Sequence, residues 1–527
     1  MKKIQTIGSG TYGVVYSARQ SSKSNKEVAV KRNIIDSDIS FSGSIKEMDL
    51  LNRLRGHPYI VKLISVSFGS PLTVCNSPII NKNGYSYKED YLHFIFEKGE
   101  KNLHNLIYEK EIHVSHLKLA MLHLLLAVEY MHAKGVIHRD IKPANLLWFV
   151  ENEKGCVKLC DFGLSKIKSF QEPSSPHLVT CWYRAPEICS KDDNYSFSSD
   201  MWSVGCVIYE MISKKALLLG SKDDDDKILS KIISILPSPD SEDICNITKG
   251  NKIQLIKESS PRYRKSWKEM INLSKEDTKD FNKYPGKQAS YKNYLDLIEK
   301  MLQLNSKDRI SAKESLSHNF FKPYSEKINY CREKFPPVSK EEPHISIIEC
   351  KERKWATKLA FTVFNNRTSL LWYRHRIIFQ SIDMFDRYLV YLEKEKEEKE
   401  EEYKTETDKC GKYMTRYNTQ LRFIVCLYMC IKYFSTLSLP IPFQELTSED
   451  YKNGQALEDA ENFEKFMLQY VLRFKIYRET IYEAIDRKEE SEILDDFKIR
   501  DLLLSYGTSK GKENIKPSEL LNLYLKK

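Results

Sequence analysis

The chain has 527 residues, of which 41% are hydrophobic and 30% are charged. At roughly 100–200 residues per domain, this length predicts two to four globular domains, and the composition excludes a disordered or fibrous protein. The net charge is +10, which over this length is too small to indicate nucleic-acid binding. We therefore expect no nucleic-acid partner.

Three further features concern the compartment. There is no run of about 18 apolar residues, so we expect no membrane span and no membrane partner. The N-terminus lacks the apolar stretch of a signal peptide. The twelve cysteines contain no C-x-x-C pair, which disfavours a disulfide framework and a zinc site. Together these features predict an intracellular protein, in the cytoplasm or the nucleus.

Periodicity divides the chain into zones, which we take in order. Short β-rich runs and one helical pattern fill the first zone, at Gly13–Ala18, Glu27–Arg32, Leu92–Glu97 and Ser44–Leu54. Helical patterns dominate 106–325, with Ser115–His132 the clearest. The proline-containing segment 326–344 predicts a linker. Residues 345–486 predict an all-helical domain interrupted by the acidic run 393–402, and 487–527 a polar tail.

A glycine-rich loop lies at the start of the chain, where residues 8–15 read GSGTYGVV. Glycines let a backbone approach phosphate closely and present its N–H groups. The β-branched residues at its end favour a flap between two strands, although the spacing alone also fits an ordinary hairpin turn. The residues expected to bind nucleotide here are Ile7, Gly8, Ser9, Gly10, Thr11, Tyr12, Gly13, Val14 and Val15.

One lysine and one glutamate follow this loop. Lys31 ends the predicted strand VAVK and can bridge phosphate oxygens as a point charge. Glu47 lies on the next predicted helix, where its carboxylate could hold the ammonium in position. Taken singly, each could equally be a solvated surface residue.

Two loops further on carry the most specific motifs. Residues 138–145 read HRDIKPAN, in which Asp140 can orient a hydroxyl proton, Lys142 can neutralise phosphoryl charge and Asn145 can hold a metal ion. The sequence DFG begins at Asp161, which offers a second hard oxygen ligand for Mg²⁺. The sequence APE, ending at Glu187, closes the segment. This order of motifs indicates phosphoryl transfer.

On these motifs, residues 1–325 resemble a eukaryotic protein kinase. The sequences GTYG from Gly10, WYRAPE from Trp182 and SDMWSVGC from Ser199 are similar to those of the cyclin-dependent kinases and their close relatives. The resemblance implies an α+β bilobal fold, with an N-lobe of about 1–98 and a C-lobe of about 99–325. It also implies that Asp200 braces the catalytic loop.

The same resemblance assigns roles in binding ATP and Mg²⁺. Gly8, Gly10 and Gly13 would cover the phosphates, and Lys31, held by Glu47, would grip them. Asp161 and Asn145 would bind the metal, while Asp140 would orient the substrate hydroxyl. The adenine would lie among Ile7, Val15, Ala29 and Leu147, with Phe96 behind it and Glu97–Gly99 as the hinge.

Substrate and regulation follow from the resemblance as well. The segment from Leu178 to Thr180 would favour proline after the acceptor, so the expected partners are protein substrates with Ser/Thr-Pro sites. Thr11 and Tyr12 match inhibitory phosphorylation sites, and Ser175 lies where the activating threonine lies.

Two substitutions weaken the case for Ser175. A phosphate there would face Lys46, Arg139 and Lys166, where the family has three arginines. Lysine lacks the bidentate fork of arginine. We therefore expect phosphorylation of Ser175 to matter less in this chain than in the family.

The C-terminal third resembles a cyclin box at three places. The sequence DRYL from Asp386, the apolar run from Cys426 to Tyr433, and Phe463–Arg478 match successive cyclin helices in order and spacing. Phe434 and Ser435 stand where the family has two glutamates. The resemblance implies an all-α, cyclin-like domain fused in cis as an intramolecular partner and activator, an arrangement suited to a compact genome such as that of a large DNA virus.

Alternatives stay open from sequence alone. The helical region could be an unrelated docking domain, or the chain could be a pseudokinase scaffold, although every catalytic position is filled. The aspartates at 223–226 are expected to form a solvated loop without a role in a site.

Overall fold

The protein is described from a computed structural model of the whole chain. The described residues are 2–10, 13–19, 27–33, 38–69, 91–109, 112–151, 154–167, 181–190, 195–219, 224–236, 265–283, 287–336, 380–381, 383–385, 387–388 and 419–434. The chain divides into two compact units, one of residues 1–34 and 50–338 and the other of residues 35–49 and 339–527.

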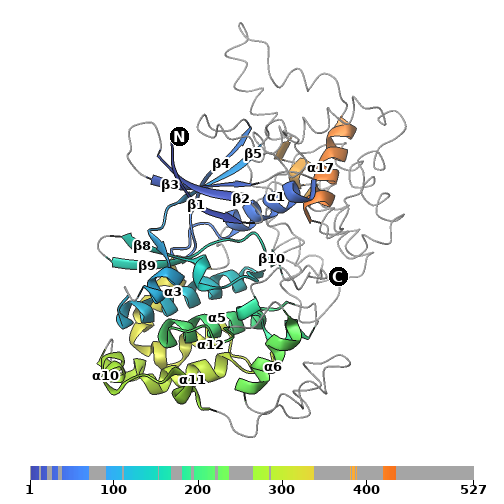
Figure 1. Ribbon diagram of the computed structural model, residues 1–527. Coiled ribbons are helices and arrows are strands. Elements are labelled where there is room, and N and C mark those ends of the chain that lie inside the picture. Colours follow the sequence, from blue (N-terminus) through green and yellow to red (C-terminus); the bar gives the residue numbers. More distant parts are fainter. Residues whose placement is uncertain are drawn as a thin grey trace. The chain divides into compact units, whose positions relative to one another are not determined.

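The first unit begins with a five-stranded antiparallel sheet in the order β1-β2-β3-β5-β4 (Figure 1). Its strands are β1 (Lys2–Gly10), β2 (Gly13–Arg19), β3 (Glu27–Asn33), β4 (Leu63–Gly69) and β5 (Tyr91–Glu97). The three predicted strands are therefore confirmed. On one face, Tyr16, Ala18, Val28, Val30 and Ile95 form a buried apolar cluster. The alternation of the strands leaves the other face for the lysine of β3.

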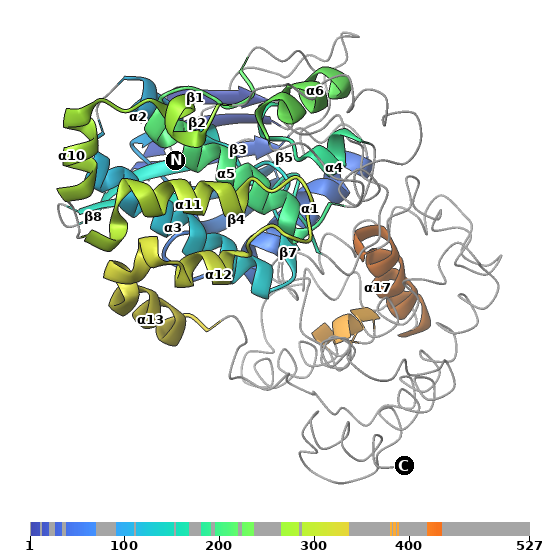
Figure 2. The same cartoon turned by 90° about the horizontal axis from the view of Figure 1, so that it is seen from below.

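Helices make up most of the remainder of this unit (Figure 2). They are α2 (Leu103–Tyr108), α3 (Val114–Ala133), α4 (Pro186–Cys189), α5 (Phe197–Ser213), α6 (Asp225–Ile235), α9 (Trp267–Ile271), α10 (Lys275–Lys283), α11 (Tyr291–Met301), α12 (Ala312–Ser317) and α13 (Ser325–Lys334). Helix α3 is long and apolar enough to cross a membrane, but 72% of its most apolar window is buried within the protein. This burial is typical of a core helix.

Short elements connect these helices. The strands β6 (Lys101–Asn102), β8 (Leu146–Glu151) and β9 (Lys154–Leu159) form one small sheet, and β7 (Val136–Ile137) pairs with β10 (Lys166–Ile167). The 3₁₀ turns are η1 (Pro143–Asn145), η3 (Cys181–Tyr183), η4 (Lys287–Ala289) and η5 (Asn319–Tyr324). A β-sheet lobe followed by a helical lobe confirms the predicted bilobal fold.

The segment from 326 to 334 corrects the sequence-based boundary, because it is helix α13 and not linker. Arg332 makes a bidentate ion pair with Glu129 of α3, at 2.6 and 3.1 Å. Phe335 packs edge-on against the ring of His57, with ring centroids 5.9 Å apart. The prolines made this segment look like a linker, but all of them lie beyond the helix. A linker can therefore begin no earlier than residue 337.

The second unit contains most of helix α1 (Asp38–Arg53), namely its residues up to Asp49. It also contains helical residues between 380 and 388 and helix α17 (Thr419–Phe434). Phe385 packs edge-on against Phe423 of α17, with centroids 5.4 Å apart. The helices predicted around 377–389 and 421–433 are thus confirmed where described. The acidic run, the helices predicted after 460 and the tail lie outside the described residues.

Candidate active site

The glycine-rich loop is a turn between β1 and β2, as the strand–turn–strand prediction required. Gly10 pairs with Gly13 across the turn. Gly13 has φ 152°, and a Cβ there would lie 2.1 Å from the carbonyl oxygen of Arg32. Only glycine fits this backbone. Thr11 and Tyr12 lie outside the described residues, so their regulatory role stays a prediction.

Strand register brings the phosphate-binding residues together. Gly8 pairs with Val15, and Val15 pairs with Lys31 on the next strand. Because paired residues of an antiparallel sheet share a face, Lys31 lies on the same face of the sheet as Gly8 and Val15. Its Nζ is 3.5 Å from Oδ1 of Asp161.

Lys31 stabilises the ionised form of Asp161. Partial burial raises the pKa of Asp161, but the Lys31 ammonium and hydrogen bonds from Lys31 and Gly163 outweigh it, so the pKa lies below its usual value. The carboxylate is therefore ionised and can accept a cation. Glu47 is buried in α1 within the second unit, and its pairing with Lys31 stays a prediction.

The residues predicted to surround adenine are not packed into the core. Ile7 is 45% exposed, and Val15, Ala29, Phe96 and Leu147 are each partly exposed. Ala29 pairs directly with Phe96. Apolar side chains that are left partly open can line a cleft for a flat apolar ring. Their role around adenine stays a prediction.

The predicted hinge, Glu97–Gly99, makes contacts that the sequence did not predict. Lys158 of β9 lies 3.0 Å from the Glu97 carboxylate, which also accepts a hydrogen bond from the backbone N–H of Lys62 at 2.7 Å. A Cβ on Gly99 would lie 3.0 Å from Cβ of Leu147. The hinge is thus tied to the strand that leads directly to Asp161.

The catalytic loop gathers its three predicted residues. Lys142 Nζ lies 2.7 Å from Oδ2 of Asp140. Asn145 Nδ2 donates to that same Oδ2 at 2.9 Å and to the Asp140 carbonyl at 2.8 Å. An ammonium and an amide therefore fix one carboxylate, which can orient a hydroxyl group for attack.

Asp200 forms hydrogen bonds to the backbone of the catalytic loop, as expected. Its carboxylate accepts hydrogen bonds from the backbone N–H groups of His138 and Arg139, at 2.8 and 2.9 Å. His132 Nε2 approaches it at 2.9 Å. Arg139 and Asp161 adopt φ values of 69° and 63°. Such backbone strain persists where the surroundings over-determine it.

The donor set fits Mg²⁺. Asp161 offers a carboxylate, and the Nδ2 contacts of Asn145 leave its Oδ1 as an acceptor. Hard oxygen ligands of this kind suit Mg²⁺, which takes its other ligands from water and phosphate. Bound there together with the nucleotide, the ion would neutralise phosphoryl charge.

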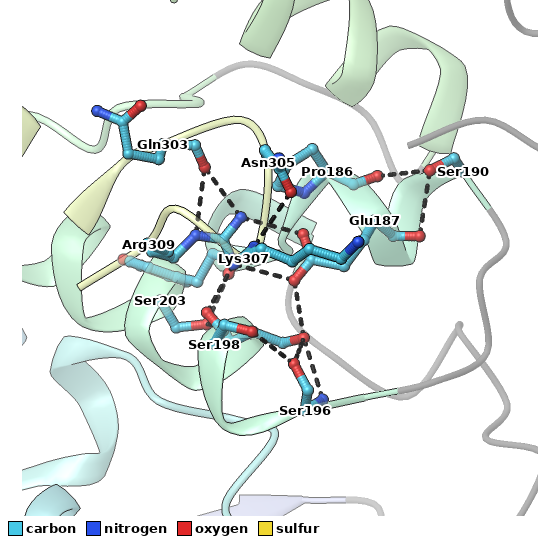
Figure 3. Close-up of polar contacts among 12 residues, drawn as sticks. Pro186, Glu187, Ser190, Ser196, Ser198, Ser203, Gln303, Asn305, Lys307 and Arg309 are labelled. Carbon is cyan, nitrogen blue, oxygen red and sulfur yellow. Dashed lines mark hydrogen bonds and ion pairs between the residues drawn. The ribbon is translucent and has the colours of Figure 1, made fainter. Parts of the chain in front are cut away.

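The activation segment, which runs from the DFG motif at Asp161 to the APE motif at Glu187, is anchored in the core at its end (Figure 3). Arg309 NH1 and NH2 lie 3.0 and 3.1 Å from the two carboxylate oxygens of Glu187, and Ser199 donates to Glu187 at 2.8 Å. Arg309 was not identified from sequence, since no motif contains it. Ser175 and Thr180 lie outside the described residues.

The aspartates at 224–226 also differ from the expectation of a solvated loop. Asp224 caps α6, accepting hydrogen bonds from the N–H groups of Asp226 and Lys227. Asp225 pairs with Arg184, with NH1 and Oδ1 2.5 Å apart. The apolar spacing of Ile228, Leu229, Ile232 and Ile233 was the signal for this helix. Residues 224–226 are thus the N-cap and first turn of a helix and not a solvated loop, while Asp223 lies outside the described residues.

Known proteins match the region that contains this site. The model of the protein kinase domain matches residues 1–321. Extracellular signal-regulated kinase 2 of Dictyostelium discoideum is 32% identical over 333 residues, covering 60% of this chain and 78% of that protein. Mitogen-activated protein kinase 2 of Arabidopsis thaliana is 32% identical over 324 residues, covering 61% and 76%. Mitogen-activated protein kinase HOG1 of Colletotrichum orbiculare is 31% identical, covering 61% and 78%.

These matches refine the sequence-based resemblance. They support the wider branch of kinases that includes these relatives, and not the cyclin-dependent type in particular. The family match ends at residue 321, so it says nothing of the C-terminal third.

Proposed function

The chain belongs to the protein kinase family and is a serine/threonine kinase that uses ATP and Mg²⁺, and from this premise we propose that it is a proline-directed kinase activated in cis by its own C-terminal domain. The catalytic part of this proposal depends on one arrangement. Asp140, held by Lys142 and Asn145, lies in the same unit as the Lys31–Asp161 pair. A base and a phosphate-gripping cation are the parts that phosphoryl transfer needs.

The proline preference is supported by the resemblance of Leu178–Thr180, just before Trp182, to the segment that shapes the substrate pocket in the cyclin-dependent kinases and their close relatives. We expect the full chain to phosphorylate a Ser-Pro peptide with a kcat/KM at least about tenfold above that of the matched Ser-Ala peptide, because one well-fitted contact is worth roughly 1–3 kcal/mol. Steady-state kinetics on the two peptides measure this ratio. Equal kcat/KM values would contradict the preference.

The fused-activator proposal draws on helix α1. Residues 35–49, which include most of α1 and Glu47, belong to the same compact unit as residues 339–527. The packing of the 380–388 segment against α17 fits successive helices of a cyclin box. A domain that shares a unit with the Glu47 helix is well placed to set its position. Tethering would make that docking intramolecular, at roughly millimolar effective concentration.

Dilution after cleavage tests activation in cis. A specific protease site replaces residues within 337–344, beyond α13, so that the cut falls outside the helices of the kinase domain. The uncut chain should keep a constant rate per molecule from micromolar to nanomolar concentration. The cut chain should lose activity on dilution, because its domains then separate.

The control is a chain with a scrambled, uncleavable site, treated with the same protease. If the cut chain keeps full activity at nanomolar concentration, the helical domain does not activate the kinase. It would then be a docking domain, as the alternative from sequence allows.

A further inference from the structure

The segment Cys181–Arg184, near the end of the activation segment, is held through the side chains of Tyr183 and Arg184. Cys181–Tyr183 forms the turn η3, and Arg184 follows it. This segment directly continues Leu178–Thr180, which is expected to bind the substrate residue after the acceptor. Whatever fixes η3 therefore affects how the protein substrate is held.

The first anchor is Glu210 of α5, which is 1% exposed. One of its carboxylate oxygens accepts a hydrogen bond from the Tyr183 hydroxyl at 2.7 Å, and the other accepts one from the Tyr108 hydroxyl at 2.8 Å. Burial and the neighbouring carboxylate raise the pKa of both phenols well above the usual value. Both phenols therefore remain donors, and the carboxylate links them.

Tyr108 extends this hydrogen-bond network to the protein surface. It is the last residue of α2 and is 42% exposed. Helix α2 packs against η1, the turn that contains Asn145. Tyr108 thus connects an element beside the catalytic loop with η3, through one buried carboxylate. No sequence motif of the active site includes Tyr108 or Glu210.

The second anchor is Asp225, in the first turn of α6. Its contact with Arg184, at 2.5 Å, is between side chains that are 10% and 1% exposed. A pair this well shielded from water is little screened by salt. Turn η3 packs against both α5 and α6, so the two anchors hold it from two helices.

We propose that Tyr108, Glu210 and Asp225 are positioning residues for substrate binding, which fix the segment Cys181–Arg184 and thereby set the affinity for the protein substrate. This proposal rests on the proposed role of Leu178–Thr180 in binding the residue after the acceptor, although it does not require that residue to be proline. The fused activator does not enter it.

The competing explanation is that these contacts only stabilise the fold. The two explanations differ in kinetics. A loss of fold would lower the amount of active enzyme and the melting temperature together. A loss of positioning would raise KM for the peptide while leaving KM for ATP unchanged, because Lys31 and Asp161 are not touched.

The experiment uses the full chain and a serine peptide that the wild type phosphorylates, chosen from an array. The variants are Tyr108→Phe, which removes one hydroxyl from a partly exposed side chain, and Asp225→Asn. The control is Tyr330→Phe, an exposed tyrosine on α13 whose hydroxyl lies 2.8 Å from Lys334 Nζ. For each, kcat, both KM values and the melting temperature are measured.

We expect peptide KM to rise about fivefold for Tyr108→Phe and about tenfold for Asp225→Asn, since each loses a hydrogen bond to a charged partner. KM for ATP should stay within about twofold, and Tyr330→Phe should match the wild type. An unchanged peptide KM in Tyr108→Phe would overturn the proposal. So would a rise in both KM values with a lower melting temperature in Tyr108→Phe, or an equal rise in Tyr330→Phe.

Discussion

Replacing Asp140 with asparagine should lower kcat about a thousandfold, the typical loss when a positioned base is removed. Asparagine has nearly the same shape, but it cannot accept the hydroxyl proton. Its amide would also lose the charge that pairs with Lys142, now 2.7 Å away. KM for ATP should change little, because the Lys31–Asp161 pair is separate from this group. Peptide phosphorylation under saturating ATP measures the effect.

The matched control is Asp308→Asn, an exposed aspartate outside the site. It should keep wild-type kcat, since surface substitutions of this kind act weakly. If Asp140→Asn kept more than about a tenth of the wild-type kcat, Asp140 would not be the group that orients the hydroxyl, because general acid–base groups contribute at least a hundredfold.

Local patterns were enough to predict the parts of the site that are contiguous in sequence. The loop HRDIKPAN already contains Asp140, Lys142 and Asn145, so their grouping needs no knowledge of the fold. The β-strand pattern around Lys31 likewise places it under the glycine flap, as the register of β2 and β3 confirms.

Partners that are distant in sequence were not predictable. Arg309 lies 122 residues from Glu187, and only the packing of the helical lobe brings them together. Asp225 was dismissed because a run of aspartates is usually solvated. Asp226 is exposed, while Asp225 lies in the first turn of α6 and pairs with Arg184. The first turn of α6 gives the adjacent residues Asp225 and Asp226 different surroundings, which the composition of the run does not reveal.

Replacing Arg309 with methionine should lower the free energy of unfolding by about 3–5 kcal/mol, the cost of leaving a buried carboxylate without its partner. Arg309 and Glu187 are 0% and 8% exposed. Methionine fills similar volume but donates no hydrogen bond, and among the described residues Ser199 alone would remain as a side-chain donor to Glu187. The double variant Glu187→Gln with Arg309→Met should recover part of the loss, because it buries no charge.

The loss of unfolding free energy in Arg309→Met should depend on pH. Burial raises the pKa of Glu187, but Arg309 outweighs burial and holds it below the ordinary value of 4.5. Its contribution is therefore present above about pH 4.5 and is lost as the pH falls through the lower folded pKa. In Arg309→Met burial would be opposed only by the hydrogen bonds from Ser199 and the backbone, so Glu187 would protonate more readily and the deficit should shrink from pH 7 to pH 4. Urea unfolding at pH 7 and pH 4 measures this deficit in the free energy of unfolding, with Lys300→Met as the control. That lysine pairs with Asp296 at 2.9 Å on the surface, so its loss should cost about 0.5 kcal/mol or less. A deficit at pH 7 no larger than that of Lys300→Met would mean that the Glu187–Arg309 pair does not hold the activation segment to the core.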